Sequence, residues 1–86
     1  PINLMETKIK IYGTKRCHKT KYHKSFFETR NINYVFYDVE ENNTHAKELR
    51  NLYTNRKLNF PTIIIGSKKL RNPSEKDLNK WLSKFL

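Results

Sequence analysis

The chain has 86 residues, a formal net charge of +10 at pH 7 and a single cysteine. This length predicts one small domain stabilised by packing, because a lone thiol cannot form an internal disulfide. No apolar run is long enough to span a bilayer and the first residues lack the layout of a secretory signal, so we expect a cytoplasmic protein with no membrane segment. We interpret residues 1–7 as a disordered or tag-like N-terminus and residues 8–86 as the domain.

The first half of the chain predicts a strand, a helix and a second strand. Lys8–Tyr12 alternates polar and apolar residues, which is typical of a strand with one buried face. The period changes to that of an amphipathic helix over His18–Arg30, where Tyr22 and two phenylalanines are expected on the buried side. Aromatic and β-branched residues over Tyr34–Val39 predict the second strand. A strand–helix–strand order of this length indicates a parallel pair.

The second half predicts a helix, two strands and a last helix. Thr44 is the expected N-cap of a helix over His45–Tyr53. The almost wholly apolar run Thr62–Ile65 favours a strand buried on both faces at the centre of a sheet. Leu70 follows a turn and is assigned to a short edge strand. Ser74 is the expected N-cap of the last helix, whose apolar residues recur at helical spacing.

Cys17 lies at the expected junction between the first strand and the first helix. Backbone N–H groups at a helix start carry partial positive charge, which favours a thiolate over a thiol. Lys15, Arg16 and Lys19 add full positive charges around the sulfur. The alternative is a buried, inert thiol, the common state of a free cysteine. The polar and basic neighbours favour a reactive nucleophile.

The order β-α-β-α-β-β-α, with Cys17 at the first strand–helix junction and Phe60-Pro61-Thr62 entering the third strand, resembles the glutaredoxin-type branch of the thioredoxin-like fold. This is an α/β fold with a four-stranded mixed sheet flanked by helices, and the resemblance covers essentially residues 8–86. It implies a cis peptide bond at Pro61, which would lie beside the nucleophile. It also implies that the backbone of Phe60 pairs with a bound peptide.

The resemblance implies a thiol–disulfide oxidoreductase, in which the Cys17 thiolate attacks a disulfide or a glutathionylated cysteine of a protein substrate. Thr20 stands where the family usually has a second cysteine. The chain is therefore a monothiol version, and an external thiol, from glutathione or a reductase, must resolve the mixed disulfide. The Thr20 hydroxyl could donate to the sulfur or equally bond to the backbone.

The same resemblance implies no tightly bound cofactor and makes glutathione the expected co-substrate. Lys15 is then the expected contact to a glutathione carboxylate, and Ser74, at a helix N-terminus, is a second candidate. Members that hold glutathione usually carry a glycine pair, a small residue and an aspartate after the third strand. This chain has Leu70–Glu75 there, which looks more like glutaredoxin-like donors served directly by a reductase.

Three alternatives stay open. The first is a non-catalytic module of the same fold that holds an acidic protein or nucleic acid on its basic surface. The second is an iron–sulfur carrier bridging two chains, although the usual Gly-Phe-Ser after the cysteine is His18-Lys19-Thr20 here. The third is an arsenate-reductase-like protein, for whose longer helical insertion this chain has little room.

Two further classes of site are not expected. Cys17 and the three histidines lack a recognisable ligand spacing, so no metal site is predicted. Nucleic-acid binding through stacked bases is also not expected, because Tyr12, Tyr22 and Trp81 fall on predicted core faces.

Overall fold

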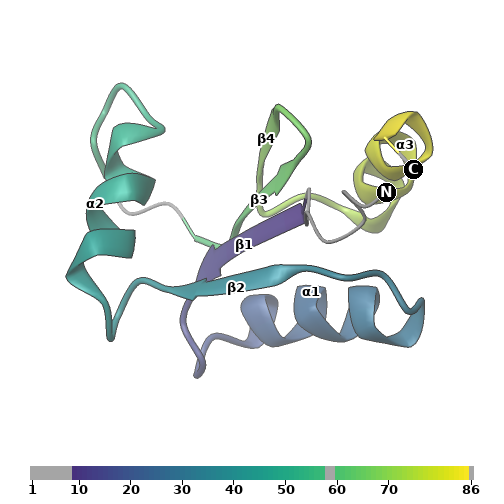
Figure 1. Ribbon diagram of the computed structural model, residues 1–86, viewed down its shortest axis with the longest axis horizontal. Coiled ribbons are helices and arrows are strands. Elements are labelled where there is room, and N and C mark those ends of the chain that lie inside the picture. Colours follow the sequence, from purple (N-terminus) through teal and green to yellow (C-terminus); the bar gives the residue numbers. More distant parts are fainter. Residues whose placement is uncertain (1–8, 58–59, 86) are drawn as a thin grey trace, which may run out of the picture.

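A mixed sheet lies between two layers of helices in the computed structural model, which describes residues 9–57 and 60–85 (Figure 1). The interpretation of residues 1–7 as a separate N-terminus falls outside the described residues. The predicted order β-α-β-α-β-β-α is confirmed. The elements are β1 (Ile9–Gly13), α1 (His18–Thr29), β2 (Val35–Asp38), α2 (Asn43–Asn51), β3 (Thr62–Ile65), β4 (Lys68–Arg71) and α3 (Glu75–Phe85).

The strands are arranged in the order β2-β1-β3-β4. β1 and β2 are parallel, as predicted, whereas β1 with β3 and β3 with β4 are antiparallel. Ile11 lies opposite Phe36 on one side and Ile63 on the other. Because β3 has neighbours on both sides and helices on both faces, Thr62, Ile63 and Ile65 are buried, as expected, while Ile64 is partly buried. The β3–β4 turn begins at Gly66, whose φ of 62° lies in the left-handed region that glycine adopts easily.

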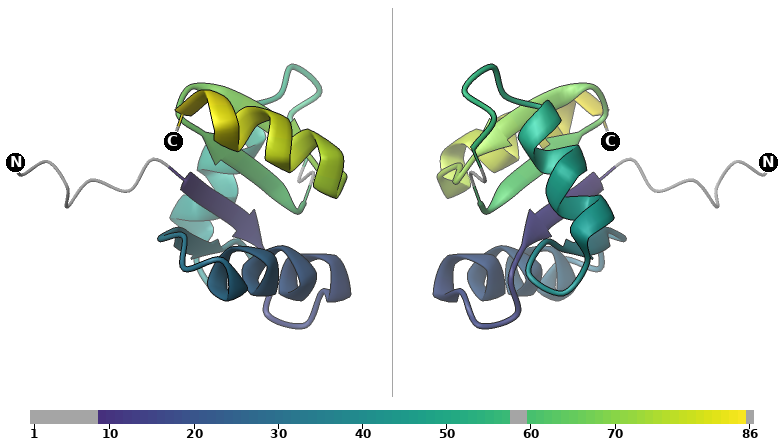
Figure 2. Two further views of the ribbon diagram at one scale, coloured as in Figure 1. Left: turned by 90° about the vertical axis from the view of Figure 1, so that its right-hand side faces the viewer. Right: turned by 90° about the vertical axis from the view of Figure 1, so that its left-hand side faces the viewer.

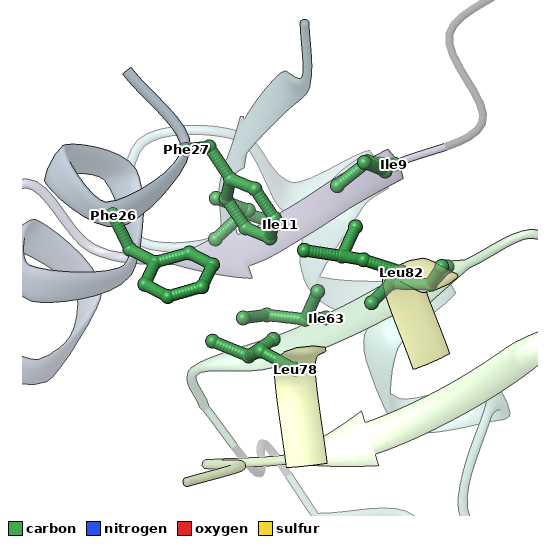
Figure 3. Packing of buried hydrophobic residues seen from close by; sticks show 8 residues of the cluster. Ile9, Ile11, Phe26, Phe27, Ile63, Leu78 and Leu82 are labelled. Atoms are coloured by element: carbon green, nitrogen blue, oxygen red, sulfur yellow. The ribbon is translucent and has the colours of Figure 1, made fainter. Parts of the chain in front are cut away.

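The larger core lies between the sheet and the helix pair α1 and α3. Figures 1 and 2 show these two helices on one face, with α2 on the other. Figure 3 shows the packing of this core, whose buried residues are Ile9, Ile11, Phe26, Phe27, Ile63, Ile65, Leu78 and Leu82. Trp81 packs against the edge of this core and is partly buried. Among the described residues, no helix is long and apolar enough to cross a membrane.

A smaller core holds α2 against the opposite face of the sheet, through Tyr12, Val39, Ala46 and Leu49. The predicted cap of α2 was wrong. Asn42, not Thr44, is the N-cap, and its side-chain oxygen accepts the N–H of Thr44 at 2.9 Å and of His45 at 3.2 Å. Asn42 has the extended backbone that an N-cap requires, so Thr44 already lies inside the helix.

The buried face of α1 also differs from the prediction. Tyr22, expected inside, is 49% exposed, and its hydroxyl donates to Glu75 Oε2 at 2.6 Å. Thr20 and His23 are buried instead, in line with Phe26. The half of this face nearest the start of α1 is therefore polar. For α3 the expected cap is confirmed, because the N–H of Asp77 donates to Ser74 Oγ at 3.2 Å.

Candidate functional site

Cys17 is the N-cap of α1, with an extended backbone conformation (φ −78°, ψ 124°). Its N–H donates to the Thr14 carbonyl at 3.3 Å, which closes the turn after β1, and its own carbonyl accepts the N–H of Lys21 at 3.0 Å. The thiol is partly exposed. The first turn of α1, all of which is described, contains no acidic residue. The sulfur therefore lies at the positive end of the helix dipole without a competing carboxylate in that turn.

The pKa of Cys17 is set by opposing effects whose balance lowers it below the ordinary thiol value. Partial burial of the sulfur raises the pKa, because it disfavours the charged form. The hydroxyl and the backbone N–H of Thr20 lower the pKa. The backbone N–H of Lys19 and the charge of its side chain lower it further. The fraction of nucleophilic thiolate at neutral pH is thereby increased.

Two of the three cations expected to stabilise the thiolate are engaged elsewhere. Lys15 Nζ lies 3.4 Å from Glu41 Oε1, and Arg16 is paired with Glu40. Both pairs are exposed at the surface. Lys19 is the cation of the three whose charge lowers the pKa of Cys17. The expectation that Lys15 and Arg16 hold the anion is corrected accordingly.

Cys17 opens into a cavity of about 510 Å³, lined by Thr14, Arg16, Cys17, Val39, Glu40 and Phe60. Phe60 is 39% exposed, so part of its surface is available to a ligand. The Phe60–Pro61 peptide bond is cis, as the resemblance implied, and Pro61 is buried. The structure thus brings the nucleophile and the residue before Pro61 to one cavity.

Thr20 lies behind the thiol and not on the surface that a substrate would meet. Its side chain is fully buried and packs against Gly13, the last residue of β1. Oγ1 forms no hydrogen bond within ordinary limits to any described residue, so its proton remains free to be donated to an ionised sulfur. Direct contact between Thr20 and a substrate, one of the sequence-based expectations, does not fit this burial.

Ser74 lines a second cavity, of about 530 Å³, on the other side of the start of α1. The residues around it are His18, Lys19, Tyr22, His23, Asn72, Pro73, Ser74 and Glu75. Lys15 lines neither of these two cavities. The structure therefore places Phe60 with Cys17 and places Ser74 in a neighbouring hollow. Across the described part of the chain, no group of three or more His, Cys, Asp or Glu side chains is arranged to hold a metal ion.

Sequence reasoning missed Val39 and Glu40, which reach the Cys17 cavity from the end of β2. A signal for them was present, because parallel strands carry their carboxyl ends to the same edge of a sheet. The burial of His23 gave no such signal, since a histidine next to a lysine on a basic helix is usually solvated.

Comparison with known proteins agrees with this architecture. The glutaredoxin family model matches residues 9–70. A search of curated protein sequences gave no match. Among solved structures, a mutant of a thioredoxin-like protein is 23% identical and superposes with a TM-score of 0.74, covering 91% of this chain and 97% of that one.

Two solved glutaredoxins share the same fold. A glutaredoxin from Archaeoglobus fulgidus has a TM-score of 0.74 at 13% identity, covering 92% of this chain and 89% of its own. Buckwheat glutaredoxin, solved as a complex with glutathione, has a TM-score of 0.70 at 15% identity. The match covers 92% of this chain and 76% of the buckwheat chain. With the family model matching most of its length, the chain belongs to the glutaredoxin family, whose general chemistry is thiol–disulfide exchange.

Proposed function

We propose that this chain is a monothiol oxidoreductase that uses Cys17 to reduce protein disulfides or glutathionylated cysteines, with glutathione as the resolving thiol. The observation that carries the proposal is the placement of a partly exposed sulfur of lowered pKa at the start of α1, in a cavity shared with Phe60. No second thiol is available in the chain, since its sequence contains one cysteine.

The proposed cycle has two exchange steps. The Cys17 thiolate attacks the glutathione sulfur of a glutathionylated protein, a new disulfide forms to Cys17, and the protein thiolate leaves and takes a proton from water. A glutathione thiolate then attacks this mixed disulfide, so that oxidised glutathione is released and the Cys17 thiolate returns. The products of the cycle are oxidised glutathione and the free protein thiol. Two electrons have then passed from the glutathione pool to the protein cysteine. The groups that lower the pKa of Cys17 also make it a better leaving group in the second step.

Substrate docking is proposed along the backbone at Phe60, by addition of an extended segment in the manner of a strand. Support comes from the exposure of Phe60 and from its position in the Cys17 cavity. For glutathione, the Lys15 ammonium would have to leave Glu41 to meet a carboxylate. Such an exchange costs little, because exposed ion pairs contribute only about 0–1 kcal/mol. Ser74 would serve only a ligand that extends into the second cavity.

The test is incubation of the protein with oxidised glutathione, followed by intact-mass analysis. We expect one glutathione adduct, formed rapidly at neutral pH and reversed by reduced glutathione, and none with Cys17→Ser. An activity assay with a glutathionylated peptide should lose turnover in the same variant. Turnover retained by Cys17→Ser, or no adduct on the wild-type protein, would falsify the proposal.

A second candidate, a binding module for an acidic partner, is favoured by one observation. Three ammonium groups surround the ring of Trp81, those of Lys68, Lys84 and Lys80 at 4.8, 5.0 and 5.4 Å from its centroid. None of the three is within ion-pair distance of a carboxylate in the described part of the chain. Salt-sensitive binding that survives Cys17→Ser, together with no exchange activity in the wild type, would support this candidate over the first.

A further inference from the structure

The two sides of the Cys17 cavity come from distant parts of the sequence. Cys17 begins α1, whereas Phe60 stands just before β3. The pairing of β1 with β3 holds the two strands together, but Cys17 and Phe60 lie beyond the paired residues. A substrate that lies along Phe60 and reacts at Cys17 requires these two segments to keep a fixed separation. A residue placed to fix this separation is His23, six residues beyond Cys17 on the buried face of α1.

His23 is only 2% exposed, and its Nδ1 has no hydrogen-bond partner among the described residues. His23 and Asn72 line the same cavity. Burial lowers the pKa of His23, and the side chain of Asn72 opposes this by raising it. A polar ring in the interior costs stability unless it has a partner. The available partner is Asn72, in the connection between β4 and α3.

Asn72 continues the path to the other side of the cavity. Its backbone N–H donates to the carbonyl of Pro61 at 2.8 Å. Its φ of 44° is in the left-handed region, where asparagine is one of the few non-glycine residues that are tolerated. Asn72 thus lies between the ring of His23, with which it shares a cavity, and the carbonyl of Pro61, to which it is hydrogen-bonded just before β3.

We infer that His23 is a positioning residue that holds Phe60 at its working distance from Cys17 through Asn72. This inference rests on the proposed function, because it assigns His23 a role in docking an extended substrate and none in the chemistry of the sulfur. Displacement of a docking segment by about 1 Å can cost as much as about a hundredfold in rate. A reagent that needs only the sulfur would not sense that displacement.

Tyr22 provides a matched control. It is the neighbour of His23 and also joins α1 to the start of α3, by its hydrogen bond to Glu75. That bond is exposed and does not lead to Pro61. Loss of the Tyr22 hydroxyl should therefore leave substrate docking unchanged.

The experiment compares His23→Leu, Asn72→Gly, the double variant and Tyr22→Phe with two substrates. One is a glutathionylated peptide long enough to lie along Phe60, and the other is the small disulfide formed by mercaptoethanol. Glycine accepts the backbone conformation of Asn72 and keeps its N–H, so Asn72→Gly removes the link even if His23→Leu fails to fold.

We expect kcat/KM for the peptide to fall about tenfold in His23→Leu and Asn72→Gly, while the small-disulfide rate stays within about twofold of wild type. The double variant should lose no more than either single one, because both remove the same link. Equal losses with both substrates, or no loss with the peptide, would overturn the inference alone. Absence of exchange by the wild type with either substrate would overturn the proposed function and this inference with it.

Discussion

The substitution Gly13→Ala tests how closely the end of β1 is packed against the start of α1. A Cβ atom at Gly13 would lie 2.3 Å from Thr20 Oγ1, 2.9 Å from its Cγ2 and 3.1 Å from its Cβ. Both branches of the threonine side chain meet the new atom, so rotation about χ1 exchanges one clash for the other. Thr20 is fully buried and cannot swing into solvent. Relief therefore requires the first turn of α1 to move away from the sheet.

The size of the effect follows from these contacts. Ordinary carbon contacts are about 3.5–4.0 Å, so the required movement is on the order of 1 Å. Overpacking of this kind costs about 1–3 kcal/mol. The lower entropy of the unfolded alanine chain offsets about 0.4–1 kcal/mol of that. We expect a net loss of about 1–2 kcal/mol in the free energy of unfolding, and each kcal/mol corresponds to roughly 4–8 °C in Tm for a domain of this size.

Urea and thermal unfolding of the wild type, Gly13→Ala, Thr20→Ala and the double variant measure this coupling. Alanine at position 20 removes both branch atoms that the new Cβ would meet, so Gly13→Ala should cost clearly less in that background. Equal stability of wild type and Gly13→Ala, or additive effects in the double variant, would refute this account of the packing.

Three further predictions concern ionisation. Thr20→Val removes the hydroxyl and should raise the pKa of Cys17, whereas Thr20→Ser should keep that pKa low. The pH dependence of Cys17 alkylation measures both pKa values. Identical profiles for the two variants would contradict the role of the hydroxyl. Lys19→Gln should raise the pKa of Cys17 while Lys15→Gln leaves it unchanged in the same assay, and equal shifts would show that Lys15 also acts on the sulfur. Burial holds the pKa of His23 below its ordinary value of about 6.5, so the unfolded chain binds more protons between the lowered pKa and about 6.5. Stability of the wild type should therefore rise with pH through that window and be complete above it. His23→Leu should lose this slope in urea titrations, and a slope kept by the variant would show that His23 is not its source.

The parts of the fold that the sequence predicted well are those where one physical signal dominates. Thr62–Ile65 was placed within its observed bounds because a β-branched run between Pro61 and Gly66 has few other conformations available. The start of α2 was misplaced because Asn42 and Thr44 are both good caps, and only the backbone conformation decides between them.

The candidate site was predicted less completely, for a different reason. The sequence shows how many charges surround Cys17 but not how they pair, and the parallel pairing of β1 with β2 brings Glu40 next to Arg16. The polar part of the buried face of α1 was not predicted, because Tyr22 is more apolar than His23 and was therefore expected inside. In the structure His23 is buried and Tyr22 is exposed. Which side of a helix is buried was decided here by its contacts with β1 and the β4–α3 connection.

With Thr20 enclosed behind the sulfur, an adduct on Cys17 has no neighbouring thiol in the chain that could release it. In the proposed cycle its decay is then a second-order process, and its half-life varies inversely with the concentration of free thiol in the surroundings. A dithiol relative would clear the same adduct at a rate fixed by its own geometry. The occupancy of Cys17 would instead follow the supply of reductant, high when that supply falls and low when it recovers.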